Sequence, residues 1–301
     1  MIGLGNAGRA LVKALGAGRR LWVHDRDPAA RDGLEGTGPA PPVMADSAAE
    51  LAAHANLIIF SLPSPAASLS VGKAIRGALA PGTVVLETST VGPEDVERLH
   101  EMLAPAGAQV IDAAIIGGVH GLAQGHGVFL VGPPEEEVGP AARILRSICE
   151  EIFFLKRRGD GMRAKLVVNA VSHTLYVLLL EAGALAAAQD IPMSVFARLM
   201  ARESGLMRPL THRFADRLRK GDFSGGMSTI NARKDSGLIL DAARALGVPL
   251  FAISASHAVY DIAVAEGLGP LDYASVGRLW EKWLGVSCFS GWCNDFGGNA
   301  P

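Results

Sequence analysis

The chain has 301 residues and a formal net charge of −2, because 28 Lys and Arg stand against 30 Asp and Glu. Hydrophobic residues make up 49% of the chain and charged residues 19%, which excludes a disordered protein and a solvated coiled coil. The near-neutral charge lacks the basic surplus of a general nucleic-acid binder, so we expect a globular protein with no nucleic-acid partner.

Cysteine usage and hydropathy bear on the compartment. The three cysteines, Cys149, Cys288 and Cys293, are an odd number in a long chain, which favours a reduced compartment. No further ligands complete a metal-binding set beside them, so we expect no metal. The longest uncharged apolar run, 166–180, is too short and too polar to span a bilayer, and the chain start lacks a signal-peptide pattern. We therefore expect a cytoplasmic protein with no membrane partner.

The first half of the chain alternates short β-branched runs with helical patterns. The predicted strands cover 21–24, 57–62, 83–87, 109–113, 128–131 and 152–155. The predicted helices cover 7–15, 47–55, 66–79, 93–103 and 134–149. This alternation indicates a parallel sheet covered by helices on both faces.

The pattern changes at Gly161, after which only helical patterns follow. They cover roughly 162–189, 193–202, 208–219, 230–246, 251–266 and 271–284. We therefore predict an α/β domain at 1–160 and an all-helical domain at 161–301, joined by the long first helix of the second domain. The last stretch, 287–301, is rich in Gly and Asn and is predicted to be a loose tail.

A glycine pattern marks the start of the first helix. Gly3, Gly5 and Gly8 form G-x-G-x-x-G, in which the glycines permit a tight turn, a close backbone approach to a pyrophosphate, and close helix–strand packing. Asn6 and Ala7 open the helix, whose free N–H groups attract phosphate. The pattern predicts a Rossmann-type dinucleotide-binding domain; the alternative is a glycine turn with a purely structural role.

An acidic residue at the end of the next strand bears on the choice of dinucleotide. Asp25 lies 17 residues after Gly8, near the spacing needed to bind ribose hydroxyls. Its carboxylate would repel a 2′-phosphate, whereas Arg26 could bind one, although Asp27 offsets that charge. We therefore expect NAD as the cofactor, with NADP as the alternative.

The first strand is unusually short. Only Met1 and Ile2 precede Gly3, although this strand normally lies in the middle of the sheet and is several residues long. We expect either a start site assigned too late or a truncated chain.

Further segments resemble one family. They are ETST at 87–90, DAAIIGG at 112–118, GDGMRAK at 159–165 followed by Asn169, and KD at 234–235. With the glycine turn, these segments resemble the β-hydroxyacid dehydrogenases, which include 3-hydroxyisobutyrate dehydrogenase and share a dinucleotide-binding domain of the 6-phosphogluconate dehydrogenase type. The resemblance covers nearly all of 1–285 in chain order.

The resemblance implies roles for residues near the cofactor. Thr90, together with Leu62 and Pro63 at the end of the second predicted strand, would lie beside the cofactor. Lys234 would approach the nicotinamide.

The resemblance also implies that Lys165 is the catalytic lysine. A lysine in a partly desolvated site can have its pKa lowered towards the working pH and exchange a proton with the reacting hydroxyl. Asn169 follows four residues later and shares its helix face, so it could bind the reacting oxygen or hold Lys165 in place. The alternative is an exposed lysine at a helix start.

The substrate loop departs from the family at one position. Gly117 and Gly118 would offer backbone N–H groups to the substrate carboxylate, but Ile116 stands where the family has Ser. An apolar side chain cannot donate that hydrogen bond, so the acid group is held differently or the substrate is less polar. His173 could contact substrate, or it could be a hydrogen-bonded interior histidine.

The expected function is hydride transfer between NAD(P) and a small β-hydroxyacid or its semialdehyde. Imine reductases share this fold but commonly replace the lysine, and a noncatalytic cofactor-binding relative would also be expected to lose it. The helical domain would serve substrate binding and assembly into a homodimer or homotetramer.

Overall fold

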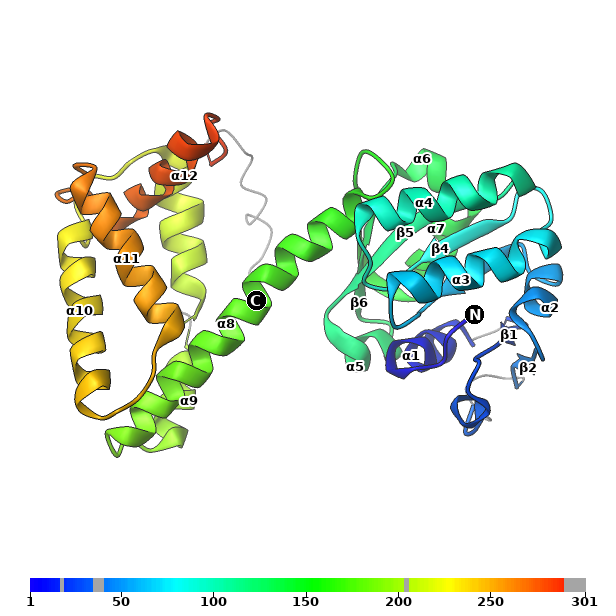
Figure 1. Cartoon of the computed structure of the whole chain (residues 1–301), viewed down its shortest axis with the longest axis horizontal. Helices are drawn as coiled ribbons and strands as arrows, with labels where there is room; N and C mark the ends of the chain where they lie inside the picture. Colours follow the sequence, from blue (N-terminus) through cyan, green and yellow to red (C-terminus); the bar gives the residue numbers. More distant parts are fainter. Residues whose placement is uncertain (17–18, 35–40, 203–205, 290–301) are drawn as a thin grey trace. The chain divides into compact units, whose positions relative to one another are not determined.

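A computed structural model describes residues 1–16, 19–34, 41–202 and 206–289. The chain divides into two compact units, Met1–Ala170 and Val171–Pro301 (Figure 1). The first unit is an α/β domain of the Rossmann type, and the second is helical, as the sequence predicts.

The sheet of the first unit is built from a two-stranded and a five-stranded part. The strands are β1 (Trp22–Val23), β2 (Val43–Met44), β3 (Leu57–Phe60), β4 (Val84–Glu87), β5 (Gln109–Ile116), β6 (Gly127–Val131) and β7 (Cys149–Phe154). β1 pairs with β2 in parallel, and the larger part has the order β3-β4-β5-β6-β7. The sequence analysis missed β2, which is only two residues long.

The two parts of the sheet are joined through Ile2, which forms parallel bridges to both His24 and Phe60. The Ile2 N–H donates to the Ile59 carbonyl at 2.9 Å, and the Ile2 carbonyl accepts from Ser61 N–H at 3.0 Å. This short stretch of extended backbone thus lies between β1 and β3.

The expectation of an entirely parallel sheet is wrong for one pair, because β5 and β6 run antiparallel. The connection between them contains only the short helix α5 (Gly118–Ala123), which the sequence analysis also missed. A parallel crossover needs a dozen or more residues, so this short connection returns the chain in the opposite direction. β3, β4 and β5 are parallel to one another, and so are β6 and β7.

Helices cover both faces of the five-stranded sheet. They are α1 (Asn6–Leu15), α2 (Ala48–Ala53), α3 (Pro65–Ile75), α4 (Pro93–Leu103), α6 (Glu135–Val138) and α7 (Pro140–Arg146), with short 3₁₀ turns at Pro28–Arg31, Arg76–Ala78 and Ala104–Ala106. Along β3, Ile58 and Phe60 pack towards α2, α3 and α4, whereas Ile59 packs towards α1 and α7. This alternation is the period of two expected of a strand buried on both faces, and Figure 1 shows α3 and α4 side by side over one of them.

One predicted helix, 134–149, is divided in the structure. Gly139 has φ +59 and is followed by Pro140, which opens α7. Pro140 has no N–H to continue α6, so the chain turns there and a second helix starts. The last residue of the predicted helix, Cys149, instead begins β7.

The helical unit contains the second part of α8 (Asp160–Ala188) and the helices that follow it. These are α9 (Met193–Met200), the π-helix η5 (Pro209–Leu218), α10 (Thr229–Ala245), α11 (Phe251–Ala265), the 3₁₀ helix η6 (Tyr273–Val276) and α12 (Gly277–Leu284). The predicted tail at 287–301 lies mostly outside the described residues.

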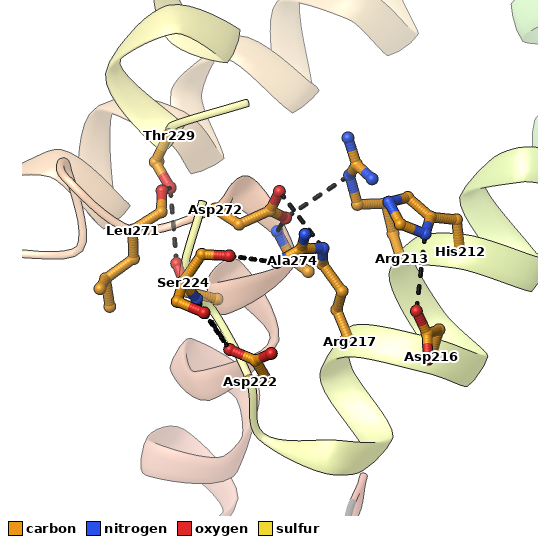
Figure 2. Close-up of polar contacts among 11 residues, drawn as sticks. His212, Arg213, Asp216, Arg217, Asp222, Ser224, Thr229, Leu271, Asp272 and Ala274 are labelled. Carbon is orange, nitrogen blue, oxygen red and sulfur yellow. Dashed lines mark hydrogen bonds and ion pairs between the residues drawn. The ribbon is translucent and has the colours of Figure 1, made fainter. Parts of the chain in front are cut away.

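A buried carboxylate organises one end of this unit. The Asp272 side chain is fully buried and accepts a hydrogen bond from Ala274 N–H at 2.9 Å, which caps η6. Arg213 and Arg217 of η5 point towards it, at 3.5 and 3.8 Å from its carboxylate oxygens (Figure 2). The carboxylate therefore connects η5 with η6.

The first unit buries two more carboxylates side by side. Glu87 ends β4 and lies in register with Asp112 of β5, and both residues are fully buried. Burial raises the pKa of Glu87 to about 7, although hydrogen bonds from Ser89 and Ser68 oppose that shift. Neutral Glu87 avoids placing two negative charges together in the core.

Replacing Glu87 should change how stability depends on pH. Because the Glu87 pKa rises from 4.5 to about 7 on folding, the unfolded chain ionises first and the folded state loses stability as pH rises between those values. Glu87→Gln removes this loss, so its free energy of unfolding relative to wild type should increase by about 2–3 kcal/mol from pH 5 to pH 8. Urea unfolding at both pH values measures the difference, and a constant difference would contradict a neutral Glu87.

Candidate active site

The glycine turn packs tightly on the sheet and leaves one side open. Gly3 has φ +93, and a Cβ there would overlap the Ser61 carbonyl oxygen. A Cβ on Gly8 would overlap the Gly3 carbonyl oxygen, whereas a Cβ on Gly5 would meet nothing within 4 Å. Gly3 and Gly8 are thus required by close packing, and the open space lies beside Gly5.

The amino end of α1 faces that open space. Gly5 is its N-cap and offers no side chain to the first-turn amides, and both Gly5 and Asn6 are exposed. First-turn N–H groups have no acceptor within their own helix and carry the positive end of the helix dipole. A cofactor pyrophosphate therefore fits here, with Gly5, Asn6, Ala7 and Gly8 as the residues that would hold it.

The predicted ribose-binding carboxylate reaches the glycine turn. Asp25 Oδ2 accepts a hydrogen bond from Leu4 N–H at 2.7 Å, and Oδ1 accepts one from Asp27 N–H at 2.9 Å. Arg26 is exposed. Arg31 was not among the predicted residues. Its guanidinium donates to the Asp25 carbonyl at 2.7 and 3.0 Å, so a second positive charge lies near this strand end.

The ends of β3 and β4 meet beside the turn. Leu62 N–H donates to Ser89 Oγ at 2.8 Å, which joins the segment after β3 to the segment after β4. Gly3 also approaches Leu62, since a Cβ on Gly3 would lie 3.2 Å from a Leu62 methyl carbon. Pro63 and Thr90 follow these segments and are exposed. Four of the predicted cofactor residues, Gly3, Leu62, Pro63 and Thr90, therefore lie at or beside one edge of the sheet.

Lys165 lies beside the predicted substrate loop. It sits in the second turn of α8, and its amino group donates to the carbonyl oxygen of Ile115, directly before Ile116 and Gly117. The side chain is half-buried, and desolvation lowers its pKa below the usual value for lysine. Asn169, one turn further along α8, is also half-buried.

The loop after β5 has the backbone that its glycines predict. Gly117 has φ +97, is exposed, and forms the N-cap of α5, which starts at Gly118. Ile116 is half-buried and packs against the core on the side of α3 and α4. Main-chain N–H groups and the Lys165 amino group are thus among the polar groups beside this loop.

Two predicted residues lie in the helical unit. His173 is exposed on α8 in the single chain. Lys234 on α10 is 62% exposed and lies 3.1 Å from the Asp235 carboxylate. The first unit therefore contains two groups of predicted site residues: those around the glycine turn, and Lys165 with the loop after β5. His173 and Lys234 belong to the second unit.

Both halves of the sequence match known families. Residues 1–155 match the NAD binding domain of 6-phosphogluconate dehydrogenase, and residues 159–280 match the NAD-binding domain of NADP-dependent 3-hydroxyisobutyrate dehydrogenase. The chain is 29% identical over 289 residues to a mitochondrial 3-hydroxyisobutyrate dehydrogenase of Drosophila melanogaster, covering 93% of this chain and 88% of that protein. It is 29% identical over 294 residues to an NAD-dependent L-serine dehydrogenase of Pseudomonas aeruginosa, covering 94% and 98%.

The fold is also found among solved structures. An imine reductase from Pseudomonas sp. matches with a TM-score of 0.83 at 23% identity, over 93% of this chain and 97% of that one. At this identity the likeness establishes the shared fold alone. The family matches, which together span most of the chain, and the geometry of the glycine turn lead to one conclusion: the chain belongs to the β-hydroxyacid dehydrogenase family of NAD(P)-binding oxidoreductases.

Proposed function

We propose that this protein transfers a hydride between NAD(P) and the CH–OH carbon of a small β-hydroxyacid, or the corresponding semialdehyde. The observation that carries this proposal is the position of Lys165. Its half-buried amino group lies at the carbonyl of Ile115, beside the loop whose glycines can face a carboxylate, and desolvation lowers its pKa.

The residues of the chain would handle the proton while the bound nicotinamide accepts or supplies the hydride. In oxidation, the C–H bond breaks as the hydroxyl O–H loses its proton, and the neutral Lys165 amine takes that proton. In reduction, the Lys165 ammonium polarises the carbonyl and returns the proton to oxygen. A lowered lysine pKa brings both protonation states closer to neutral pH.

Neighbouring groups would orient the substrate. The N–H groups around Gly117 and Gly118 can approach an acid group closely because no side chain intervenes. Asn169 shares the helix face of Lys165 and would hydrogen-bond the reacting oxygen.

An imine reductase activity is the second candidate. Ile116 favours it, because a half-buried apolar residue directly before the glycine loop suits a less polar substrate than a hydroxyacid. Lys165 counts against it, because a basic residue suited to exchanging a proton with a hydroxyl is retained. For the same reason we place the noncatalytic alternative last.

We further infer that NAD is preferred over NADP. The Asp25 carboxylate lies at the turn, where it would accept hydrogen bonds from ribose hydroxyls and repel a 2′-phosphate. Arg26 and Arg31 lie at the same strand end and moderate that repulsion.

A second copy of the chain is the partner we propose for α8. Large apolar side chains on this helix are exposed, including Val171 at 65% and Tyr176 at 64%, and Phe251 of α11 is 76% exposed. An 18-residue window of α8 has a mean hydropathy of 1.5, so by length and composition alone the helix could cross a membrane, although its central apolar run is short. Glu181 on the same helix is buried and accepts amide hydrogen bonds from α11, which favours packing within protein. Extended apolar surfaces of this kind mark protein interfaces.

Lys165→Ala should remove turnover and leave cofactor binding intact. The wild type and the variant would be assayed by nicotinamide absorbance with NAD and NADP over 3-hydroxyisobutyrate, 3-hydroxypropionate, glycerate, threonate, L-serine and a cyclic imine. We expect hydroxyacid oxidation to fall roughly 100-fold or more in the variant, the usual contribution of a positioned acid or base. Lys156→Ala, which removes an exposed lysine of the same unit, is the matched control. Wild-type turnover of the imine alone would favour the second candidate.

Asp25→Asn should weaken discrimination against NADPH. The variant keeps an acceptor oxygen for Leu4 N–H, leaves Asp27 N–H facing the side-chain NH₂, and removes the negative charge, so the ratio of NADPH to NADH dissociation constants should fall by roughly 10-fold. Fluorescence titration measures both constants. Asp32→Asn, which removes an exposed acid from the same region, should leave the ratio unchanged. An unchanged ratio in Asp25→Asn would remove Asp25 as the selecting residue.

Sedimentation velocity should show a dimer or tetramer at micromolar concentration. Val171→Asp places a charge on the exposed apolar face of α8 and should shift the protein towards monomer, whereas Lys156→Asp should not. A wild-type protein that sediments only as a monomer, or that floats with lipid vesicles, would contradict the proposed partner.

A further inference from the structure

Asp112 is buried at the junction between β5 and the start of α8. Its Oδ1 accepts a hydrogen bond from Gly159 N–H at 2.8 Å, and its Oδ2 accepts one from Met162 N–H at 3.1 Å. The residue is fully buried and has no contact with the glycine turn among the described hydrogen bonds. The two oxygens thus hold two main-chain amides at the amino end of the helix that carries Lys165.

The carboxylate is enclosed by main chain. A Cβ on Gly132 would overlap Asp112 Oδ1, and a Cβ on Gly161 would lie 2.8 Å from Oδ2. Gly159 has φ +85, a conformation that brings its N–H to Asp112 and that other residues adopt at a cost. Close contact on several sides leaves the first turn of α8 little freedom to shift.

Lys165 is three residues from Met162 and lies on the same side of the helix. Its amino group contacts the carbonyl of Ile115, which is three residues beyond Asp112 on β5. β5 and the start of α8 are therefore joined at two points. One is the buried carboxylate of Asp112, and the other is the contact between the Lys165 amino group and the Ile115 carbonyl. A change at the first point would move the second.

The influence of Asp112 is mechanical and not a direct charge effect. Desolvation accounts for the lowered pKa of Lys165, and the Asp112 carboxylate is not among the causes of that shift. The neighbouring Glu87 carries a raised pKa and does not contact α8 in any described hydrogen bond.

We propose that Asp112 is the positioning residue for Lys165: by fixing the first turn of α8 on β5, it sets the place and the partial burial of the Lys165 amino group. The link to turnover rests on the function proposed above, whereas the link to the environment of Lys165 does not. Reacting groups displaced by about 1 Å commonly lose about 100-fold in rate, so a fixed helix start matters for catalysis.

The decisive variant is Asp112→Asn. Asn has the same shape but offers one acceptor oxygen and one donor NH₂, so either Gly159 N–H or Met162 N–H must face a donor. We expect the first turn of α8 to loosen and water to reach Lys165.

The readout is competitive acetylation of lysines with acetic anhydride across a pH series, analysed by mass spectrometry, which needs no substrate. In the wild type, Lys165 should titrate below the usual range for a lysine. In Asp112→Asn, the apparent pKa of Lys165 should rise by about half a unit or more, with Lys156 unchanged. If the protein oxidises a hydroxyacid, turnover should fall roughly 10- to 100-fold while the NADH dissociation constant stays within about twofold.

Glu181→Gln is the matched control. Glu181 is also a buried carboxylate that accepts main-chain N–H groups, those of Phe251 and Ala252 at 2.8 and 2.9 Å, but it lies in the helical unit. The Glu181→Gln variant should have a lower melting temperature than the wild type and an unchanged titration of Lys165. If Asp112→Asn behaves in the same way, Asp112 has a structural role only and the proposal is overturned.

A milder variant covers the case in which Asp112→Asn does not fold. Gly159→Ala disfavours the positive φ that aims this N–H at Asp112, and it leaves the carboxylate intact. Its effect on the Lys165 titration should be smaller and in the same direction, and an unchanged titration would count against the proposal. A wild type without turnover but with the expected titration shifts would reject the proposed function and retain the positioning role.

Discussion

The backbone at Ile2 joins the two parts of the sheet in the first unit. On one side, His24 exchanges main-chain hydrogen bonds with Met1 and Gly3, and on the other Ile2 bonds to β3. The glycine turn follows Ile2 directly, and Asp25 follows His24. Four main-chain hydrogen bonds of 2.9–3.0 Å therefore set how the glycine turn lies against the Asp25 carboxylate. The contact from Leu4 N–H to Asp25 is a consequence of that pairing and not an independent feature.

The strand β5 positions the start of α8, Lys165 and the glycine loop. Within a few residues it carries a buried acceptor for α8, the carbonyl that receives the lysine, and the glycine loop. A single strand thereby places the Lys165 amino group and the main-chain N–H groups of the loop relative to each other. The cost is a pair of carboxylates buried next to each other. The fold tolerates this because burial raises the pKa of Glu87 to about 7, so that Glu87 is largely neutral below that pH, and because main-chain amides, which cannot move away, solvate Asp112.

The sequence predicts the fold and the candidate site residues better than the contacts that these residues make. The glycine spacing and the acid at Asp25 were sufficient to predict a turn and a carboxylate that the structure brings together, because they follow Ile2 and His24, which pair in parallel. The resemblance implied roles for Lys165 and for the loop, and the structure places the two side by side. The sequence did not indicate β2, which is too short to show a period, or the reversed β6, whose direction depends on the length of a connection. Asp112 looked like part of a loop motif, since burial and the amides that face a carboxylate have no signature in one sequence.

Under the proposed function, Ile116 would affect how Lys165 meets both the acid group and the reacting hydroxyl of the substrate. A hydroxyl at this position would donate a hydrogen bond to the acid group, a net contribution of about 0.5–1.5 kcal/mol. Without it, main-chain N–H groups of the loop and the Lys165 ammonium would be donors near the acid group. Binding a carboxylate favours the ammonium, whereas oxidation needs the neutral amine. Because desolvation already lowers the lysine pKa, an incoming anion would raise it again, so the binding of acid and the removal of the proton oppose each other through the same nitrogen. A substrate whose acid group lies further from the reacting carbon, or which has none, would relieve that opposition.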